Sequence, residues 1–366
     1  MALISPSRRV RRTPFSDGVE AAGVKAYTVY NRMLLPTVFE SLEADCHHLK
    51  RHVQVWDVAC ERQVQLKGPD AAALLQRITP RDVSKMGRER CFYVPVVDQN
   101  GGMLNDPVAL QVAEDTFWVS IADSDLLLWI KGVAAATGLQ VEVSEPDVSP
   151  LAVQGPKSDG LMARVFGEEV RDLRFFGIKR FDFHGTPLLI ARSGYSKQGG
   201  FEIYVEGSDL GMPLWDALFA AGEDLQVRAG GPNLIERVEG GLLSYGNDMT
   251  SANSPLECGL RKFVDANALE QCFGGAALKA EMEAGSARRI CAVAIEGELP
   301  VCDRAWPVLA EGRRVGQVTS CTWSPDFQTN VSIAMIDRSH WAAGTRVEVE
   351  TQTGMARAEV QARFWG

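Results

Sequence analysis

The sequence predicts an α+β protein of two or three domains that ends in a small β-barrel. Strands with alternating apolar residues and helices with apolar residues at helical spacing occur in the same stretches, without the strict alternation of a doubly wound sheet. The chain has 366 residues, more than the roughly 100–200 residues of a typical single domain. Near the carboxy terminus, short strands separated by turn residues replace the mixed pattern, and this change predicts the barrel.

The first α+β stretch combines alternating strands with an amphipathic helix. In the helix, Ala72, Leu75 and Ile78 share one face and can pack on a sheet. We expect strands over 62–66, 108–112, 117–121 and 140–143, and a helix over 69–78.

The second α+β stretch runs from Ser149 to about residue 260. Pro232 opens a helix that we expect to stop near Tyr245, because proline favours the first helical turn and Tyr245 precedes a glycine. The predicted elements are strands over 188–192 and 201–205 and this helix, with Leu234, Ile235, Val238 and Leu242 on its apolar face.

The carboxy-terminal stretch reads as a connecting helix over 276–284 followed by short strands. We therefore divide the chain into residues 1–283, with two α+β subdomains of which the first can be discontinuous, and a barrel domain over 284–366. The predicted barrel strands cover 314–319, 331–336, 345–350 and 356–361.

Composition favours a small molecule over nucleic acid or a membrane as the partner. The formal net charge of −9 and the pI near 5.2 give no basic surface for phosphate groups. Apolar runs such as 126–130 are far shorter than the ~20 residues of a membrane helix. At the amino terminus the arginines follow the apolar residues, which reverses the order of a secretion signal, so we expect a cytoplasmic protein.

Metal and nucleotide chemistry find no support in the motifs. The eight cysteines include no C-x-x-C pair, and the five histidines lack a metal-ligand spacing, so we expect reduced, mostly buried thiols and no metal site. The chain has no G-x-G-x-x-G or G-x-S-x-G motif, and the glycine-rich stretch 194–200 lacks the Lys-Ser/Thr ending of a phosphate loop.

Three loops combine glycines with polar or aromatic groups. In the first, Tyr93 precedes a glycine turn and Asp106 follows it, so the ring and the carboxyl group can converge on one heterocycle; a hairpin with a turn-facing Asp fits the same spacing. In the second, Glu202 and Tyr204 share a strand face after the loop 194–200. In the third, Arg237 lies near the apolar stripe of the helix that starts at Pro232.

Taken in order, these segments resemble the aminomethyltransferase family of the glycine cleavage system. The likeness extends from the stretch 52–58 (HVQVWDV) through 154–157 (QGPK) to 315–320 (VGQVTS), and so spans nearly the whole chain. The resemblance implies a three-domain ring that binds tetrahydrofolate at its centre, with residues 1–283 as the folate-binding region. It also implies an enzyme that transfers a one-carbon group to tetrahydrofolate.

The resemblance assigns roles to individual residues. Asp106 corresponds to the acid beside the reactive pterin nitrogen and is the catalytic candidate. Glu202 corresponds to the acid at the pterin ring and Arg237 to an arginine near the folate. The remaining residues expected to line the folate pocket are Tyr93, Ser120, Tyr195 and Tyr204.

Two segments depart from the glycine-cleavage pattern. The loop 194–199 reads GYSKQG, and the stretch 25–36 reads KAYTVYNRMLLP. Both are similar to a branch of the family that demethylates a small sulfonium compound. For that cation we expect aromatic contacts from Tyr30 and Tyr204.

Other activities fit the same residues. The alternatives are a folate-dependent aminomethyl- or N-methyltransferase, and a folate-binding assembly or repair factor without catalysis. The sequence does not decide the oligomeric state, and a homodimer is one possibility.

Overall fold

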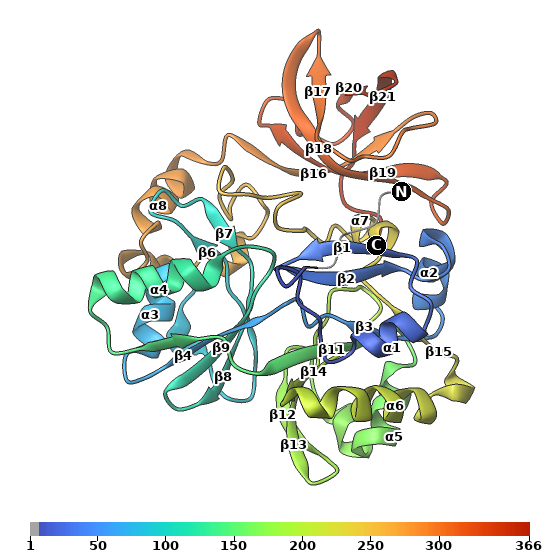
Figure 1. The fold of residues 1–366 in the computed structure, drawn as a ribbon. Helices are drawn as coiled ribbons and strands as arrows, with labels where there is room; N and C mark the ends of the chain where they lie inside the picture. Colours follow the sequence, from blue (N-terminus) through green and yellow to red (C-terminus); the bar gives the residue numbers. More distant parts are fainter. Residues whose placement is uncertain (1–6) are drawn as a thin grey trace.

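In the computed structural model, which describes residues 7–366, three units surround a common centre (Figure 1). A five-stranded antiparallel sheet has the order β10-β4-β9-β8-β5 and packs against α3 and α4. Its elements are β4 (Gln63–Lys67), α3 (Ala71–Ile78), β5 (Phe92–Tyr93), β8 (Val108–Ala113), β9 (Thr116–Ser120), α4 (Leu126–Thr137) and β10 (Glu142–Ser144). A separate pair, β6 (Val96–Val97) and β7 (Met103–Asn105), forms the hairpin beside it.

The second unit is a six-stranded sheet of order β12-β13-β14-β11-β3-β15. Its strand β3 precedes the five-stranded sheet in sequence and its other strands follow it, so the chain enters this unit twice. The strands are β3 (Val53–Asp57), β11 (Val148–Gln154), β12 (Ile178–Phe183), β13 (Thr186–Ala191), β14 (Gly200–Glu206) and β15 (Val227–Gly230). The helices are α1 (Ser16–Ala21), α2 (Leu42–Leu49), α5 (Ser158–Phe166), α6 (Gly211–Ala221) and α7 (Leu234–Glu239).

Alternation along β14 decides what faces the centre. Phe201, Ile203 and Val205 pack into the core formed with α1, α5 and α6. Because successive strand residues point to opposite faces, Glu202 and Tyr204 point away from these helices, toward the five-stranded sheet. Tyr204 joins a second core there with Leu110 of β8 and Trp118 of β9.

The carboxy-terminal unit is a closed six-stranded barrel of order β16-β19-β18-β17-β20-β21 (Figure 1). Helix α8 (Gly275–Ala284) leads into it. The strands are β16 (Arg288–Ile295), β17 (Trp306–Ala310), β18 (Arg313–Ser324), β19 (Thr329–Asp337), β20 (Arg346–Thr351) and β21 (Gly354–Val360). Short 3₁₀ helices lie in the connections, at Val83–Lys85, Glu168–Asp172, Ser208–Leu210, Glu223–Leu225, Arg261–Phe263 and Ala266–Gln271.

Helix α7 is shorter than the sequence predicts. The Asn233 side chain caps its start by accepting the N–H groups of Ile235 and Glu236. The helix ends at Glu239, because Gly241 adopts a φ of +65° and a Cβ atom there would meet the Phe364 ring at 2.4 Å. The expected continuation to Tyr245 is therefore wrong, and Leu242 lies in the following loop.

A buried ion pair joins α7 to the barrel. Arg237 donates hydrogen bonds to Asp248 (2.9 Å) and to the Ser320 hydroxyl of β18 (2.8 Å), and it is only 8% exposed. The Ser320 and Thr319 hydroxyls donate in turn to the other Asp248 oxygen, at 2.6 and 2.7 Å. This network fixes the barrel against the end of the six-stranded sheet.

Two expectations about the wider chain can be compared with the structure. Over residues 7–366 all the cysteines except Cys302 are buried, which confirms the expectation that most of them are buried. No helix in this part of the chain is long and apolar enough to cross a membrane.

We predict that Arg237→Met lowers the free energy of unfolding by about 3–5 kcal/mol, because it leaves the buried Asp248 carboxylate without its partner. Arg228→Met is the matched control, since Arg228 makes an exposed ion pair with Glu40 that should contribute at most about 1 kcal/mol. Denaturant unfolding of both variants measures the difference. Equal stabilities would show that the Arg237–Asp248 pair does not hold the barrel in place.

Candidate functional site

Three carboxyl groups come from the segments where the two sheets and the hairpin β6–β7 meet. They belong to Asp106, which follows β7, to Glu202 on β14, and to Glu61 in the loop between β3 and β4. The charges of Asp106 and Glu202 both act on Glu61. We call these three groups, with the tyrosines around them, the carboxyl recess.

The structure brings the side chains of Tyr93 and Asp106 together. The Tyr93 hydroxyl donates to Oδ2 of Asp106 at 2.8 Å, and Oδ1 of Asp106 is buried without a hydrogen-bond partner among the described residues. The hairpin is instead capped by Asp98, which accepts the N–H groups of Asn100 and Gly102 at 2.8 and 2.9 Å. The alternative of a turn-facing Asp therefore applies to Asp98, and Asp106 keeps one oxygen for another donor.

Glu202 is oriented by two hydroxyl groups. Ser193 donates to its Oε2 at 2.5 Å and Tyr204 donates to the same oxygen at 3.4 Å. Within residues 7–366, its other oxygen, Oε1, has no hydrogen-bond partner, and the residue is 8% exposed. Glu202 thus presents one free oxygen to the recess from a fixed position.

Ser120 and Tyr204 lie behind this surface. The Ser120 hydroxyl accepts a hydrogen bond from the Gln63 amide at 2.9 Å and donates to the Glu61 backbone carbonyl at 3.4 Å. Tyr204 has no accessible surface, and its ring lies 6.3 Å from that of Trp118. Both support the recess from within the core, and direct contact with a ligand stays a prediction for them.

Tyr30 and Tyr195 stand at the recess from two other sides. Tyr30 packs against the core cluster that includes Val58 and Cys60, just before Glu61, and burial raises its pKa, with the charges of Glu61 and Asp106 adding to the effect. The Tyr195 hydroxyl donates to the backbone carbonyls of Leu242 and Leu243 at 3.1 and 2.7 Å. Arg237 donates to the same Leu242 carbonyl at 3.2 Å, so it lies behind Tyr195 and its predicted contact with folate is untested.

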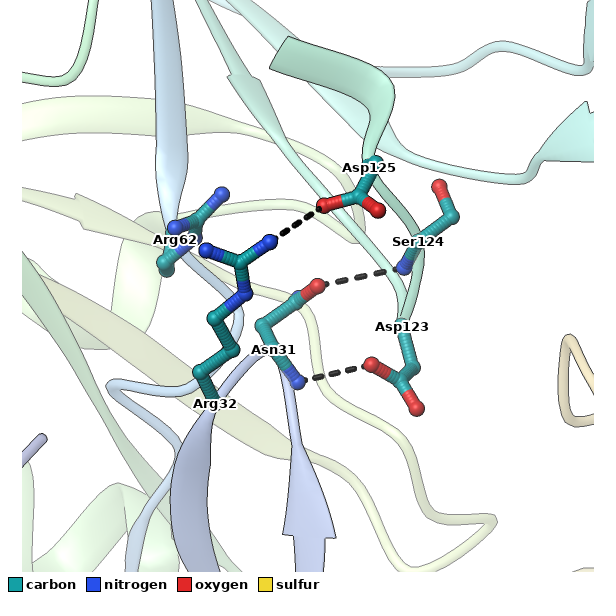
Figure 2. A pocket seen from close by; sticks show the side chains of 6 residues that line it. All are labelled: Asn31, Arg32, Arg62, Asp123, Ser124 and Asp125. Carbon is teal, nitrogen blue, oxygen red and sulfur yellow. Dashed lines mark hydrogen bonds and ion pairs between the residues drawn. The ribbon is translucent and has the colours of Figure 1, made fainter. Parts of the chain in front are cut away.

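The hairpin of β1 (Ala26–Tyr30) and β2 (Met33–Val38) is held next to the five-stranded sheet by polar residues that line a pocket of about 160 Å³ (Figure 2). Asn31 donates its backbone N–H to Asp123 at 2.7 Å and accepts the N–H of Ser124 at 3.1 Å, while Arg32 pairs with Asp125 (Figure 2). The side-chain amide of Asn31 also donates to the Cys60 carbonyl at 2.9 Å. These contacts hold Tyr30, the preceding residue, next to the loop that carries Glu61.

Desolvation sets the electrostatics of the recess. Burial raises the pKa of Asp106 to about 7, against a smaller lowering by the Tyr93 hydrogen bond. It also raises the pKa of Glu202, and that of Glu61 well above its ordinary range, where the charges of Glu202 and Asp106 add to the effect. Over residues 7–366, none of the three carboxylates forms an ion pair with a lysine, arginine or histidine. The carboxyl groups therefore hold their protons to higher pH than ordinary carboxyl groups do, and a ligand with N–H donors or a cation favours their ionised forms.

Sequence reasoning did not find Glu61. It is a single glutamate in a short loop, and neither its spacing nor a motif distinguishes it from a solvated residue. Only the meeting of two sheets brings it beside Glu202 and Asp106. The described chain contains no cluster of three His, Cys, Asp or Glu residues suited to a metal ion.

Comparison with known proteins covers the whole chain. Residues 15–268 match the family model of the GCVT N-terminal domain, and residues 288–365 match that of the glycine cleavage T-protein C-terminal barrel domain. The dimethylsulfoniopropionate demethylase DmdA of Ruegeria pomeroyi is 66% identical over 365 residues, which are 100% of either chain. An aminomethyltransferase of Bacillus cereus (strain B4264) is 30% identical over 358 residues, or 96% of each chain.

A solved structure confirms the fold. The glycine cleavage system aminomethyltransferase T from Bartonella henselae superposes with a TM-score of 0.87 at 22% identity, covering 98% of both chains. The predicted α+β architecture, a three-unit ring with a carboxy-terminal barrel, is thus correct.

The raised pKa of Asp106 predicts a pH dependence of stability. An unfolded Asp titrates near pH 4, so Asp106 holds its proton to higher pH in the folded protein. Its contribution to stability is complete below about pH 4 and is lost as the pH rises through about 7. Asn does not titrate, so the Asp106→Asn variant lacks this loss of stability. We therefore expect the melting temperature of the variant, relative to that of the wild type, to increase as the pH rises from about 5 to about 8. Thermal denaturation without folate measures it, and a constant difference would contradict the raised pKa.

Proposed function

This chain belongs to the glycine cleavage T-protein (aminomethyltransferase) family, and we propose that it is a tetrahydrofolate-dependent demethylase of dimethylsulfoniopropionate. The observation that carries the proposal is the 66% identity, over the full length, to a dimethylsulfoniopropionate demethylase. The products are 5-methyltetrahydrofolate and 3-(methylthio)propionate. The 30% identity to aminomethyltransferases makes an aminomethyl or N-methyl donor the weaker alternative.

The carboxyl recess fits a folate. Oδ1 of Asp106 and Oε1 of Glu202 both lack protein donors within the described chain, and a pterin ring offers N–H groups to such oxygens. In this assignment Glu202 holds the ring, and Asp106 and Tyr93 lie beside its reactive nitrogen. Bound tetrahydrofolate would supply the nucleophilic nitrogen that accepts the methyl group.

The residues of the recess act by position and charge. The Tyr93 hydroxyl keeps the Asp106 carboxyl group aimed at one place, and ionised Asp106 stabilises the positive charge that develops on the methyl acceptor. The sulfonium methyl group is already activated, since the departing thioether is neutral. The ring of Tyr30 is placed to attract the cation, a contact that contributes ~0.5–2 kcal/mol.

Two further assignments go with this function. We propose that the enzyme works in the cytoplasm on small molecules, without nucleic acid, and that it forms a homodimer. Light scattering on the purified protein decides the last point, since a monomeric mass at micromolar concentration would exclude the dimer.

We predict that Asp106→Asn lowers kcat by roughly 10²–10³-fold, the usual cost of losing one preorganised electrostatic contact. Asp98→Asn is the matched control, because Asp98 caps the same hairpin and should affect stability more than turnover. Both are measured as 5-methyltetrahydrofolate formed per folded molecule, alongside the melting temperature. Full turnover by Asp106→Asn would remove this residue from the mechanism.

A further inference from the structure

We propose that Glu61 is the counter-charge of the sulfonium centre and sets the preference for a cationic substrate over a neutral one of the same shape. This inference rests on the proposed function, to which it adds a residue that determines specificity. It follows from the place of Glu61 in the recess and from the partners of the other two carboxyl groups.

The position of Glu61 is fixed by its backbone. Its N–H donates to the Val58 carbonyl at 2.9 Å, and its carbonyl accepts the Gln63 amide at 3.0 Å and the Ser120 hydroxyl. The neighbouring Cys60 carbonyl accepts the Asn31 amide at the tip of the β1–β2 hairpin. The loop is thus held from both sides, between the end of β9 and the residue that follows Tyr30.

The three carboxyl groups differ in their partners. Asp106 accepts the Tyr93 hydroxyl, and Glu202 accepts the Ser193 hydroxyl. The Glu61 carboxyl group has no hydrogen-bond or ion-pair partner anywhere in residues 7–366, although it is only partly exposed. Asp106 and Glu202 are oriented to receive N–H donors at fixed places, whereas nothing in the protein neutralises Glu61.

The chemistry of the missing partner follows from this imbalance. The buried guanidinium of Arg237 is committed to Asp248 and that of Arg62 pairs with Glu145, and among the described residues no lysine, arginine or histidine forms an ion pair with the three carboxyl groups. A desolvated carboxylate without a partner is costly, so Glu61 holds its proton to higher pH than an ordinary glutamate, and a ligand that brings a positive charge favours the ionised form. A sulfonium suits the site because its charge cannot be lost with a proton. Tyr30, which packs against the segment of Val58 and Cys60 that precedes Glu61, supplies an aromatic face to the same cation.

Independent polar atoms mark the same recess as a ligand site. Oε1 of Glu202 lacks a partner in the described chain although the residue is more than nine-tenths buried, and Oδ1 of Asp106 is buried without one. These oxygens account for the folate in the proposed function. Glu61 is then the carboxyl group left for the methyl donor.

The test compares dimethylsulfoniopropionate with 4-methylpentanoate, in which a CH group replaces the charged sulfur. Binding of each is measured by calorimetry in the presence of folic acid, whose ring cannot accept the methyl group, and the KM for the sulfonium is measured with tetrahydrofolate. We expect Glu61→Gln to weaken sulfonium binding roughly ten- to a hundred-fold. The affinity for 4-methylpentanoate and for folic acid should change less than about two-fold.

Glu114→Gln is the matched control, because Glu114 is an exposed glutamate in the β8–β9 turn. Glu61→Asp keeps the charge and is the variant to measure if Glu61→Gln does not fold. A retained preference of this variant for the sulfonium over 4-methylpentanoate supports the proposal, and complete loss of the preference overturns it. A folded Glu61→Gln variant with the wild-type ratio of the two affinities also overturns it. Failure of the proposed function is a separate result, in which the wild type makes no 5-methyltetrahydrofolate from the sulfonium.

Discussion

The structure depends on one electrostatic constraint: three carboxyl groups share a desolvated recess in which the protein provides no cation. Burial raises the pKa of all three, and at Glu61 the charges of Glu202 and Asp106 add to the effect. Such an arrangement costs stability in the free protein. A ligand that donates N–H groups or carries a positive charge offsets this loss of stability when it binds, and the offset adds to the affinity for a folate and a cation.

The fold assembles this recess from segments that are distant in sequence. Strand alternation turns Glu202 toward the five-stranded sheet, while the hairpin β6–β7 ends at Asp106. The hairpin β1–β2 closes a further side and is fixed by the polar pocket around Asn31. The Arg237–Asp248 pair holds the barrel against the loop that contacts Tyr195, so the buried Arg237 serves the architecture.

The local sequence pattern was sufficient to predict those elements whose structure is decided by neighbouring residues. Each strand expected from the sequence overlaps a strand of the structure, although these are fewer than half of its strands, and the order of motifs predicts the ring and its barrel. The pairing of Tyr93 with Asp106 could be anticipated only as one of two readings, because a hairpin with a capping Asp has the same spacing. In the structure Asp98, and not Asp106, caps the hairpin, so the interpretation of Asp106 as a turn-facing residue is excluded.

Other features lie beyond any local pattern. The glycine that follows the early end of α7, Gly241, leaves no room for a side chain because of the ring of Phe364, which is far away in sequence. The role of Arg237 depends on Ser320 of the barrel, and the exceptional environment of Glu61 arises only when two sheets meet. These are tertiary effects, and a single sequence carries no sign of them.

The most direct measurement follows the methyl carbon itself. The purified protein is incubated with tetrahydrofolate and with dimethylsulfoniopropionate that carries ¹³C in both S-methyl groups, and the products are observed by NMR. The account predicts one labelled methyl group on N5 of the folate and one retained in 3-(methylthio)propionate, with no turnover when tetrahydrofolate is omitted. Label that stays entirely on the sulfonium, or a demethylation that proceeds without folate, would contradict it.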